Sequence, residues 1–211
     1  MPLSPLLPLA LLAAQGAVLD QPPSAPDPAA RYLFYLHGRI LEVQGRQAIS
    51  PEFGAYEYDA ILKAFADRGF VVISELRGPE TGIGYGKRVA IQVRGLIKAG
   101  VAADHITVAG FSKGGALAQS AAAELAEPSV NYVVMAGCFH PVPAFTARMK
   151  GHMLSIYDAK DTLAGSCAEA FARASGVKSK EIVLTLGRGH GTFFTPLKDW
   201  LDPACDWATG H

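Results

Sequence analysis

The fold of this chain is decided by the stretch from Ile106 to Gly115, which reads Ile-Thr-Val-Ala-Gly-Phe-Ser-Lys-Gly-Gly. Its first four residues are apolar and mostly β-branched, which predicts a short buried strand. An alanine-rich helix is expected from Gly114 onwards. Between strand and helix, Ser112 occupies the centre of a Gly-x-Ser-x-Gly turn, where only Gly fits two residues before and after it without a clash. Such a turn lifts the Ser112 hydroxyl over the positive end of the following helix.

Length and composition indicate a globular protein with one domain. The 211 residues are enough to bury a core that is covered on two faces. Half of the residues are apolar, 18% are charged, and 19 basic residues balance 19 acidic ones. Because no basic tract is present, we expect a small-molecule substrate rather than nucleic acid or an anionic membrane surface as the partner.

The N-terminal segment has the composition of a secretory signal peptide. Leu3–Ala14 is strongly apolar, and Ala14-Gln15-Gly16 is a small-x-small pattern suited to cleavage after Gly16. The alternative is a disordered start, because no Lys or Arg precedes the apolar stretch and three prolines interrupt it. We therefore divide the chain into a signal peptide (1–16), a Pro-rich linker (17–30) and one domain (31–211), and expect export to the periplasm or the medium.

Six apolar runs alternate with helical segments along the domain. Strands are expected at 32–36, 70–73, 106–109, 131–135, 152–157 and 181–186, and helices near 56–68, 87–98, 114–125, 167–175 and 193–201. This alternation predicts an α/β fold in which a mostly parallel sheet of about six strands carries helices on both faces. Residues 40–55 are expected to form a long loop, and the glycines at 82–86 do not match a phosphate-binding motif.

The strand, the Gly-x-Ser-x-Gly turn and the helix together resemble the nucleophile elbow of the α/β-hydrolase family. The resemblance extends over about residues 31–202 and implies a minimal version of that fold, since the family's first two antiparallel strands find no room. Only about 16 residues separate the strands at 131–135 and 152–157, which leaves no space for a lid domain. The family's catalytic order is a nucleophile, then an acid, then a histidine.

Three residues fit that order. Ser112 is the expected nucleophile and needs a base to take its proton. Among six histidines, His190 lies in a glycine-flanked loop after the last strand, which is where the resemblance places the base. The acid should follow the strand before it, which offers Asp158 and Asp161; the family's Gly-x-x-Asp spacing favours Asp161, and Asp158 stays the alternative.

The segment His37-Gly38-Arg39 follows the first strand of the domain. In the family a His-Gly at this place opens the loop that supplies an oxyanion donor, so the resemblance implies that the backbone N–H groups of Arg39 and Lys113 hold the oxyanion. His37 and Arg77 are candidate substrate-binding residues. Because Arg39 and Arg77 both follow strands, they could favour an acyl or alcohol group with negative charge; the alternative is two solvated loop arginines.

The three cysteines are Cys138, Cys167 and Cys205. Cys138 and Cys167 follow strands that are neighbours in this topology, so a disulfide between them is geometrically feasible in an exported protein. Cys205 is expected to be free, in a tail beyond the last helix. No pattern of metal ligands occurs, so we expect neither a metal nor a cofactor.

The expected function is hydrolysis of a small soluble ester or thioester through an acyl-enzyme, in a site that no lid covers. A serine peptidase or amidase would use the same triad. A different class of function, that of a non-catalytic binding protein with the same fold, is the alternative. The sequence does not indicate the substrate or the oligomeric state.

Overall fold

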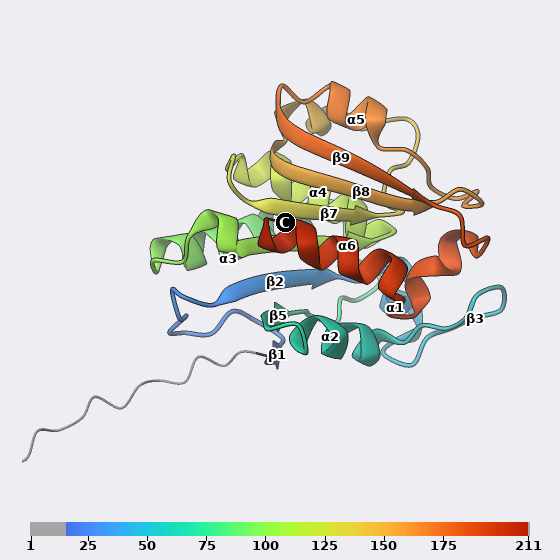
Figure 1. The fold of residues 1–211 in the computed structure, drawn as a ribbon, viewed down its shortest axis with the longest axis horizontal. Coiled ribbons are helices and arrows are strands. Elements are labelled where there is room, and N and C mark those ends of the chain that lie inside the picture. The colour runs from blue at the N-terminus through green and yellow to red at the C-terminus, as the bar shows by residue number, and fades with distance from the viewer. Residues whose placement is uncertain (1–15, 211) are drawn as a thin grey trace, which may run out of the picture.

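The computed structural model describes residues 16–210, in which one seven-stranded sheet carries helices on both faces (Figure 1). Every neighbouring pair of strands in this sheet is parallel, so the carboxyl ends of all strands meet at one edge, on the right in Figure 1. The predicted fold class is confirmed, with one strand more than the six expected. In spatial order the strands are β1 (Val18–Leu19), β5 (Phe70–Ile73), β2 (Arg31–Leu36), β6 (Ile106–Phe111), β7 (Asn131–Met135), β8 (Lys150–Asp158) and β9 (Gly176–Leu184).

The helices divide the hydrophobic core into two layers. The central strands are apolar on both faces, as a parallel sheet covered by helices requires. One face is covered by α3 (Tyr85–Lys98), α4 (Lys113–Leu125) and α5 (Ala168–Ala172). The other face is covered by α2 (Tyr58–Ala66) and α6 (Lys198–Thr209). In Figure 1, α6 crosses in front of the sheet and α4 lies behind it.

The segment 17–30, expected to be only a linker, contributes the edge strand β1. The N–H groups of Val72 and Ser74 in and after β5 donate to the carbonyls of Ala17 and Leu19. This pairing satisfies backbone groups on the outer edge of β5, which would otherwise be open to another chain. Residues 1–15 of the expected signal peptide lie outside the described residues. Within 16–210, no helix is long and apolar enough to span a bilayer.

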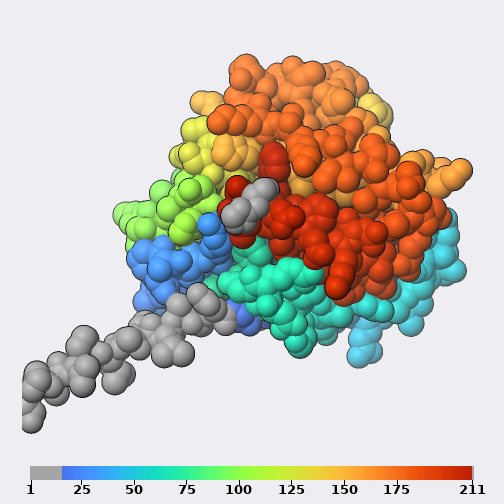
Figure 2. Space-filling model, viewed as in Figure 1, coloured from blue at the N-terminus to red at the C-terminus, as the bar shows by residue number. Residues whose placement is uncertain are grey.

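The expected long loop at 40–55 contains regular structure. It begins with the short helix α1 (Arg39–Gln44) and continues into a hairpin of β3 (Ile49–Ser50) and β4 (Gly54–Ala55). The hairpin packs against the 3-10 helix η3 (Gly189–Phe194), where the rings of Phe53 and Phe194 meet edge to face. Figure 2 shows the two segments, cyan and orange-red, side by side at the same end of the molecule.

The last helix differs most from its prediction. It was expected near 193–201 but runs from Lys198 to Thr209 and contains Pro203. Trp200, Ala204 and Ala208 recur every fourth residue and are buried, so the packing of this face outweighs the backbone hydrogen bond that proline removes. Cys205 therefore lies inside α6 rather than in a tail, and it is buried and free.

Other boundaries shift by a few residues. The last strand starts at Gly176 instead of residue 181, since β9 pairs with β8 along its whole length. The helix expected at 167–175 is shorter, Ala168–Ala172. The described residues also contain the 3-10 helices η1 (Ala103–His105) and η2 (Ala144–Arg148).

Candidate active site

Ser112 stands on a strained turn between β6 and α4. Its backbone angles, φ 54° and ψ −122°, lie in a region that residues other than glycine rarely adopt. The turn is as crowded as predicted: a Cβ on Gly110 would lie 2.1 Å from the carbonyl oxygen of Gly114, and a Cβ on Gly114 would lie 1.8 Å from that of Leu36. The Ser112 N–H donates to Met135 of β7 at 2.9 Å, which fixes the turn to the sheet.

The structure brings Ser112, His190 and Asp161 together in one hydrogen-bonded row. The hydroxyl oxygen of Ser112 lies 2.8 Å from Nε2 of His190, and Nδ1 of His190 lies 2.8 Å from Oδ2 of Asp161. Because a carboxylate accepts, Nδ1 carries the proton and Nε2 is left to accept from the serine hydroxyl. This is the geometry in which a histidine can remove the proton from a serine.

Asp161 is the expected acid that contacts His190. Its side chain is fully buried, and its second oxygen accepts the N–H groups of Leu163 at 2.8 Å and Ala164 at 3.0 Å. Burial alone would raise the pKa of this carboxyl. The hydrogen bonds from His190 and from the two backbone amides outweigh it, so the pKa of Asp161 is lowered and the group stays ionised.

Asp158, the alternative acid, is directed to a different set of donors. It is completely buried, and its oxygens accept from the N–H groups of Lys160 at 2.8 Å and Leu186 at 3.0 Å and from the Thr192 hydroxyl at 3.3 Å. Burial opposes ionisation, but these hydrogen bonds prevail and lower the pKa of Asp158. Asp158 thus ties together the loop that carries Asp161 and the turn that carries the histidine.

Two aromatic side chains pack near the imidazole of His190. The ring of Phe111 lies 4.8 Å from that of His190, and the ring of Phe53 lies 6.3 Å away. His190 is only 7% exposed. Phe111 belongs to the elbow, but Phe53 comes from the β3–β4 hairpin, and no pattern in the sequence links that residue to the site.

The two expected oxyanion donors lie at the N-termini of two helices near Ser112. Lys113 is the first residue of α4 and Arg39 is the first residue of α1, so neither N–H has an acceptor within its own helix. The α1 start is close to the nucleophile, since a Cβ on Gly38 would lie 3.6 Å from Cβ of Ser112. The N-terminus of the 13-residue α4 adds a favourable dipole for an anion at this place.

His37 and Arg77, expected to contact substrate, are buried and bonded to one another. The Arg77 N–H donates to Nε2 of His37 at 2.9 Å, and its guanidinium pairs with Glu42 at 3.1 Å. Burial, and then the charge of Arg77, lower the pKa of His37 to about 3, so its ring is neutral. Arg77 is buried and is therefore not a solvent-facing cation. Its charge is compensated by Glu42. The Arg39 side chain is exposed.

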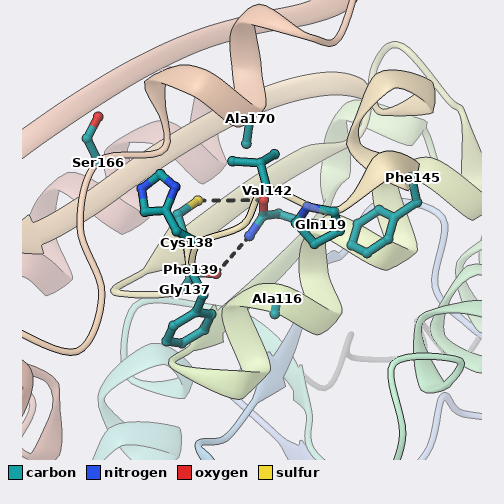
Figure 3. A pocket seen from close by; sticks show the side chains of 11 residues that line it. Ala116, Gln119, Gly137, Cys138, Phe139, Val142, Phe145, Ser166 and Ala170 are labelled. Atoms are coloured by element: carbon teal, nitrogen blue, oxygen red, sulfur yellow. Dashed lines mark hydrogen bonds between the residues drawn. The ribbon is translucent and has the colours of Figure 1, made fainter.

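A small apolar hollow lies one helical turn from the nucleophile, since Ala116, one of the residues that line it, bonds back to the Ser112 carbonyl. Its cavity volume is about 30 Å³. Figure 3 shows Gln119 reaching from α4 into it, with an amide N–H donated to the Gly137 carbonyl at 2.9 Å. The other lining residues include Phe139, Val142, Phe145 and Ala170.

The predicted Cys138–Cys167 disulfide is present and closes the loop that carries Asp161. The two Cα atoms are 5.3 Å apart, and the bonded cysteines are 29 residues apart in the sequence. Cys138 lines the hollow, with its sulfur 3.6 Å from Oε1 of Gln119. Burial raises the pKa of the free Cys205 thiol to about 12, which makes it unreactive.

Among residues 16–210, no three histidine, cysteine, aspartate or glutamate side chains gather as a possible metal site. Ser112, His190, Asp158 and Asp161 are the polar side chains described above at this edge of the sheet. The groups around them supply N–H donors and apolar walls.

Comparison with known proteins gives the fold. No family model and no curated protein sequence matches the chain. Solved structures do match: a protein described as a dienelactone hydrolase from Klebsiella pneumoniae has a TM-score of 0.58 and 14% identity, over 90% of this chain and 91% of that one. An acetyl xylan esterase from Paenibacillus sp. R4 also has a TM-score of 0.58 and 14% identity, over 90% and 78%. A truncated carbohydrate esterase from gut microbiota has a TM-score of 0.51 and 20% identity, over 89% of each chain.

Proposed function

We propose that this chain, which has the α/β-hydrolase fold, is a serine hydrolase that cleaves small soluble esters or thioesters. One observation carries the proposal: the row from Ser112 through His190 to Asp161, with both contacts at 2.8 Å. The comparisons support it, because solved proteins of this fold include esterases. Sequence identities of 14 to 20% support the fold alone, so the reaction is argued from the site.

In the proposed reaction the Ser112 oxygen attacks the substrate carbonyl carbon while Nε2 of His190 takes the hydroxyl proton. The carbonyl oxygen becomes negative and accepts from the N–H groups of Lys113 and Arg39. The tetrahedral intermediate collapses, the bond to the leaving oxygen or sulfur breaks, and Nε2 gives its proton to that group. Water then repeats the sequence on the acyl-enzyme, releases the acid and restores Ser112. Asp161 stabilises the imidazolium throughout.

The size of the hollow beside α4 favours a short acyl group. The volume is only about 30 Å³, which suits a short acyl group such as acetyl better than a long chain. Its walls of Ala116, Phe139 and Val142 are apolar, which suits a hydrocarbon group better than a charged one.

Labelling with a fluorophosphonate tests the proposal directly, because this probe reacts with an activated serine. We expect one label per chain, located on Ser112 by peptide mass spectrometry, and no label on Ser112→Ala. Hydrolysis of 4-nitrophenyl acetate should fall by roughly 10³-fold or more in the same variant, and acetyl esters should be cleaved faster than hexanoyl esters. Full activity in a folded Ser112→Ala protein would contradict the proposed nucleophile.

We also propose that the protein is exported. The apolar residues 3–14 support this, and so does the buried disulfide, since such bonds persist in oxidising compartments. The N-terminal peptide of protein recovered from the periplasm or the medium should begin at Ala17. Protein found in the cytosol with Met1 intact and three free thiols would contradict export.

A further inference from the structure

A buried carboxylate, that of Glu42, connects the two segments that supply the proposed oxyanion donors. Glu42 belongs to α1, and its side chain is 0% exposed. Its Oε1 accepts from Nε of Arg77 at 3.1 Å, and its Oε2 accepts from Nζ of Lys113. A buried charge is costly unless it is paired and hydrogen-bonded, and here both oxygens have a cationic partner.

Glu42 is connected to both residues that carry the proposed oxyanion donors. Lys113, which carries one of the proposed N–H donors in its own backbone, is bound directly through its side chain. Arg39, which carries the other, begins the six-residue helix whose fourth residue is Glu42. A helix this short has little stability of its own, so its placement depends on contacts made from outside.

Arg77 extends the connection to the residues just before α1. Its N–H donates to Nε2 of His37, and its guanidinium donates to the His37 carbonyl. Since Nε2 accepts, Nδ1 carries the ring proton and donates to the Gly38 carbonyl at 2.9 Å. The chain of contacts from Glu42 through Arg77 and His37 thus ends at the residue before Arg39.

We propose that Glu42 is a positioning residue, which holds the backbone N–H groups of Arg39 and Lys113 at the separation that the oxyanion requires. It acts through the ion pairs to Arg77 and Lys113 and touches no reacting atom. This inference rests on the proposed serine hydrolase function for its kinetic part, and its structural part stands on the contacts alone. Donors fixed before the reaction are more effective than donors that must reorganise during it.

The test replaces Glu42 by Gln, which keeps the shape but places an amide N–H group against Arg77 or Lys113. We expect kcat for 4-nitrophenyl acetate to fall roughly 10- to 100-fold, less than the loss of one oxyanion donor outright, with KM changed by less than about threefold. Glu42→Asp, which keeps the charge, should recover part of the loss. Asp202→Asn is the matched control, because Asp202 on α6 also pairs with an arginine, Arg68, away from the contacts of Glu42; its kcat should equal that of the wild type.

Hydrogen exchange supplies a readout that does not depend on activity. Amides in 37–44 should exchange roughly tenfold faster or more in Glu42→Gln than in the wild type. If the wild type proves inactive, the proposed function fails and exchange alone decides the role of Glu42. Unchanged exchange, or faster exchange with unchanged kcat, overturns the inference.

A second variant covers the case in which Glu42→Gln does not fold. Lys113→Met removes a partner whose side chain is 25% exposed, so this variant should fold. We expect a smaller fall in kcat, roughly 3- to 10-fold, because the Arg77 pair is left intact. A folded Lys113→Met protein with the kcat of the wild type overturns the inference.

Discussion

On one side of Ser112, the loops after β8 and β9 carry two buried carboxylates, Asp158 and Asp161, of which Asp161 contacts the imidazole of His190. On the other side, Glu42 in the segment after β2 pairs with two cations, Arg77 after β5 and Lys113 at the start of α4. We call these the proton side and the oxyanion side. The difference follows the charge that each must stabilise during the proposed reaction: a positive imidazolium on the first and a negative oxygen on the second.

The two sides also differ in how they are held. On the proton side a disulfide closes the loop that carries Asp161, and Asp158 is held by backbone N–H groups and a hydroxyl. The oxyanion side depends on ion pairs and on a neutral histidine. The two sides should therefore respond differently to mutation, to reduction and to pH.

The largest expected effect is that of Asp161→Asn. The amide cannot stabilise the imidazolium and favours the wrong tautomer of His190, so kcat for an activated ester should fall roughly 10³-fold or more. Circular dichroism should show an unchanged fold. A greater loss of kcat in Asp158→Asn than in Asp161→Asn would reverse the assignment of the two carboxylates.

Removal of the disulfide should weaken the proton side through stability. Replacing Cys138 and Cys167 together by Ser should lower the free energy of unfolding by about 3–4 kcal/mol, as the chain-entropy model gives for a loop of this length. Urea denaturation measures it. Cys205→Ala, which removes only a buried free thiol, is the control and should cost about 1 kcal/mol. Equal losses in the two proteins would show that the bridge contributes nothing.

Asp158→Asn should destabilise the fold by about 1–3 kcal/mol, because an amide cannot accept all the N–H groups that now converge on the carboxylate. The loss depends on pH. The pKa of Asp158 is lowered in the folded state, so its stabilising effect is present above its ordinary pKa and disappears as the pH falls through the folded value. The difference between wild type and variant should therefore shrink below about pH 4; a constant difference down to pH 2 would argue against an ionised Asp158.

A further prediction concerns His37 on the oxyanion side, whose stabilising effect depends on a higher range of pH. A histidine with a folded pKa of about 3 binds its proton only on unfolding, so stability is full above its ordinary pKa and decreases as the pH falls from about 6.5 towards 3. The slope should approach about 1.4 kcal/mol per pH unit. Urea denaturation between pH 7 and 4 should show a shallower slope in His37→Gln than in the wild type. Identical slopes would mean that His37 is not buried in its neutral form.

Some of this architecture was predictable because it is local in the sequence. The two glycines around Ser112 are required by one sharp turn, and the apolar runs of β2, β6 and β7 mark strands that are buried on both faces. The order of Ser112, Asp161 and His190 follows from the strand ends on which they stand. The same reasoning placed Cys138 and Cys167 at one edge, and the structure confirms their disulfide.

Other features depend on contacts between distant segments. Phe53 lies near His190 because the β3–β4 hairpin packs against η3. The strand β1 forms because it pairs with the free edge of β5. The sequence contains Glu42 as one acid in a stretch expected to be a loop, with no pattern that pairs it with Arg77, 35 residues away.

Elements whose residues are neighbours in the chain follow from local sequence: the elbow, the central strands and the chemical groups at their ends. Contacts in space are needed to show which carboxylate meets His190, what compensates Arg77, and that α6 continues through Pro203. The physical reason is that burial and pairing of charge depend on distance in space. Asp158 and Asp161 are three residues apart and of the same type, and only the donors around each assign them different roles.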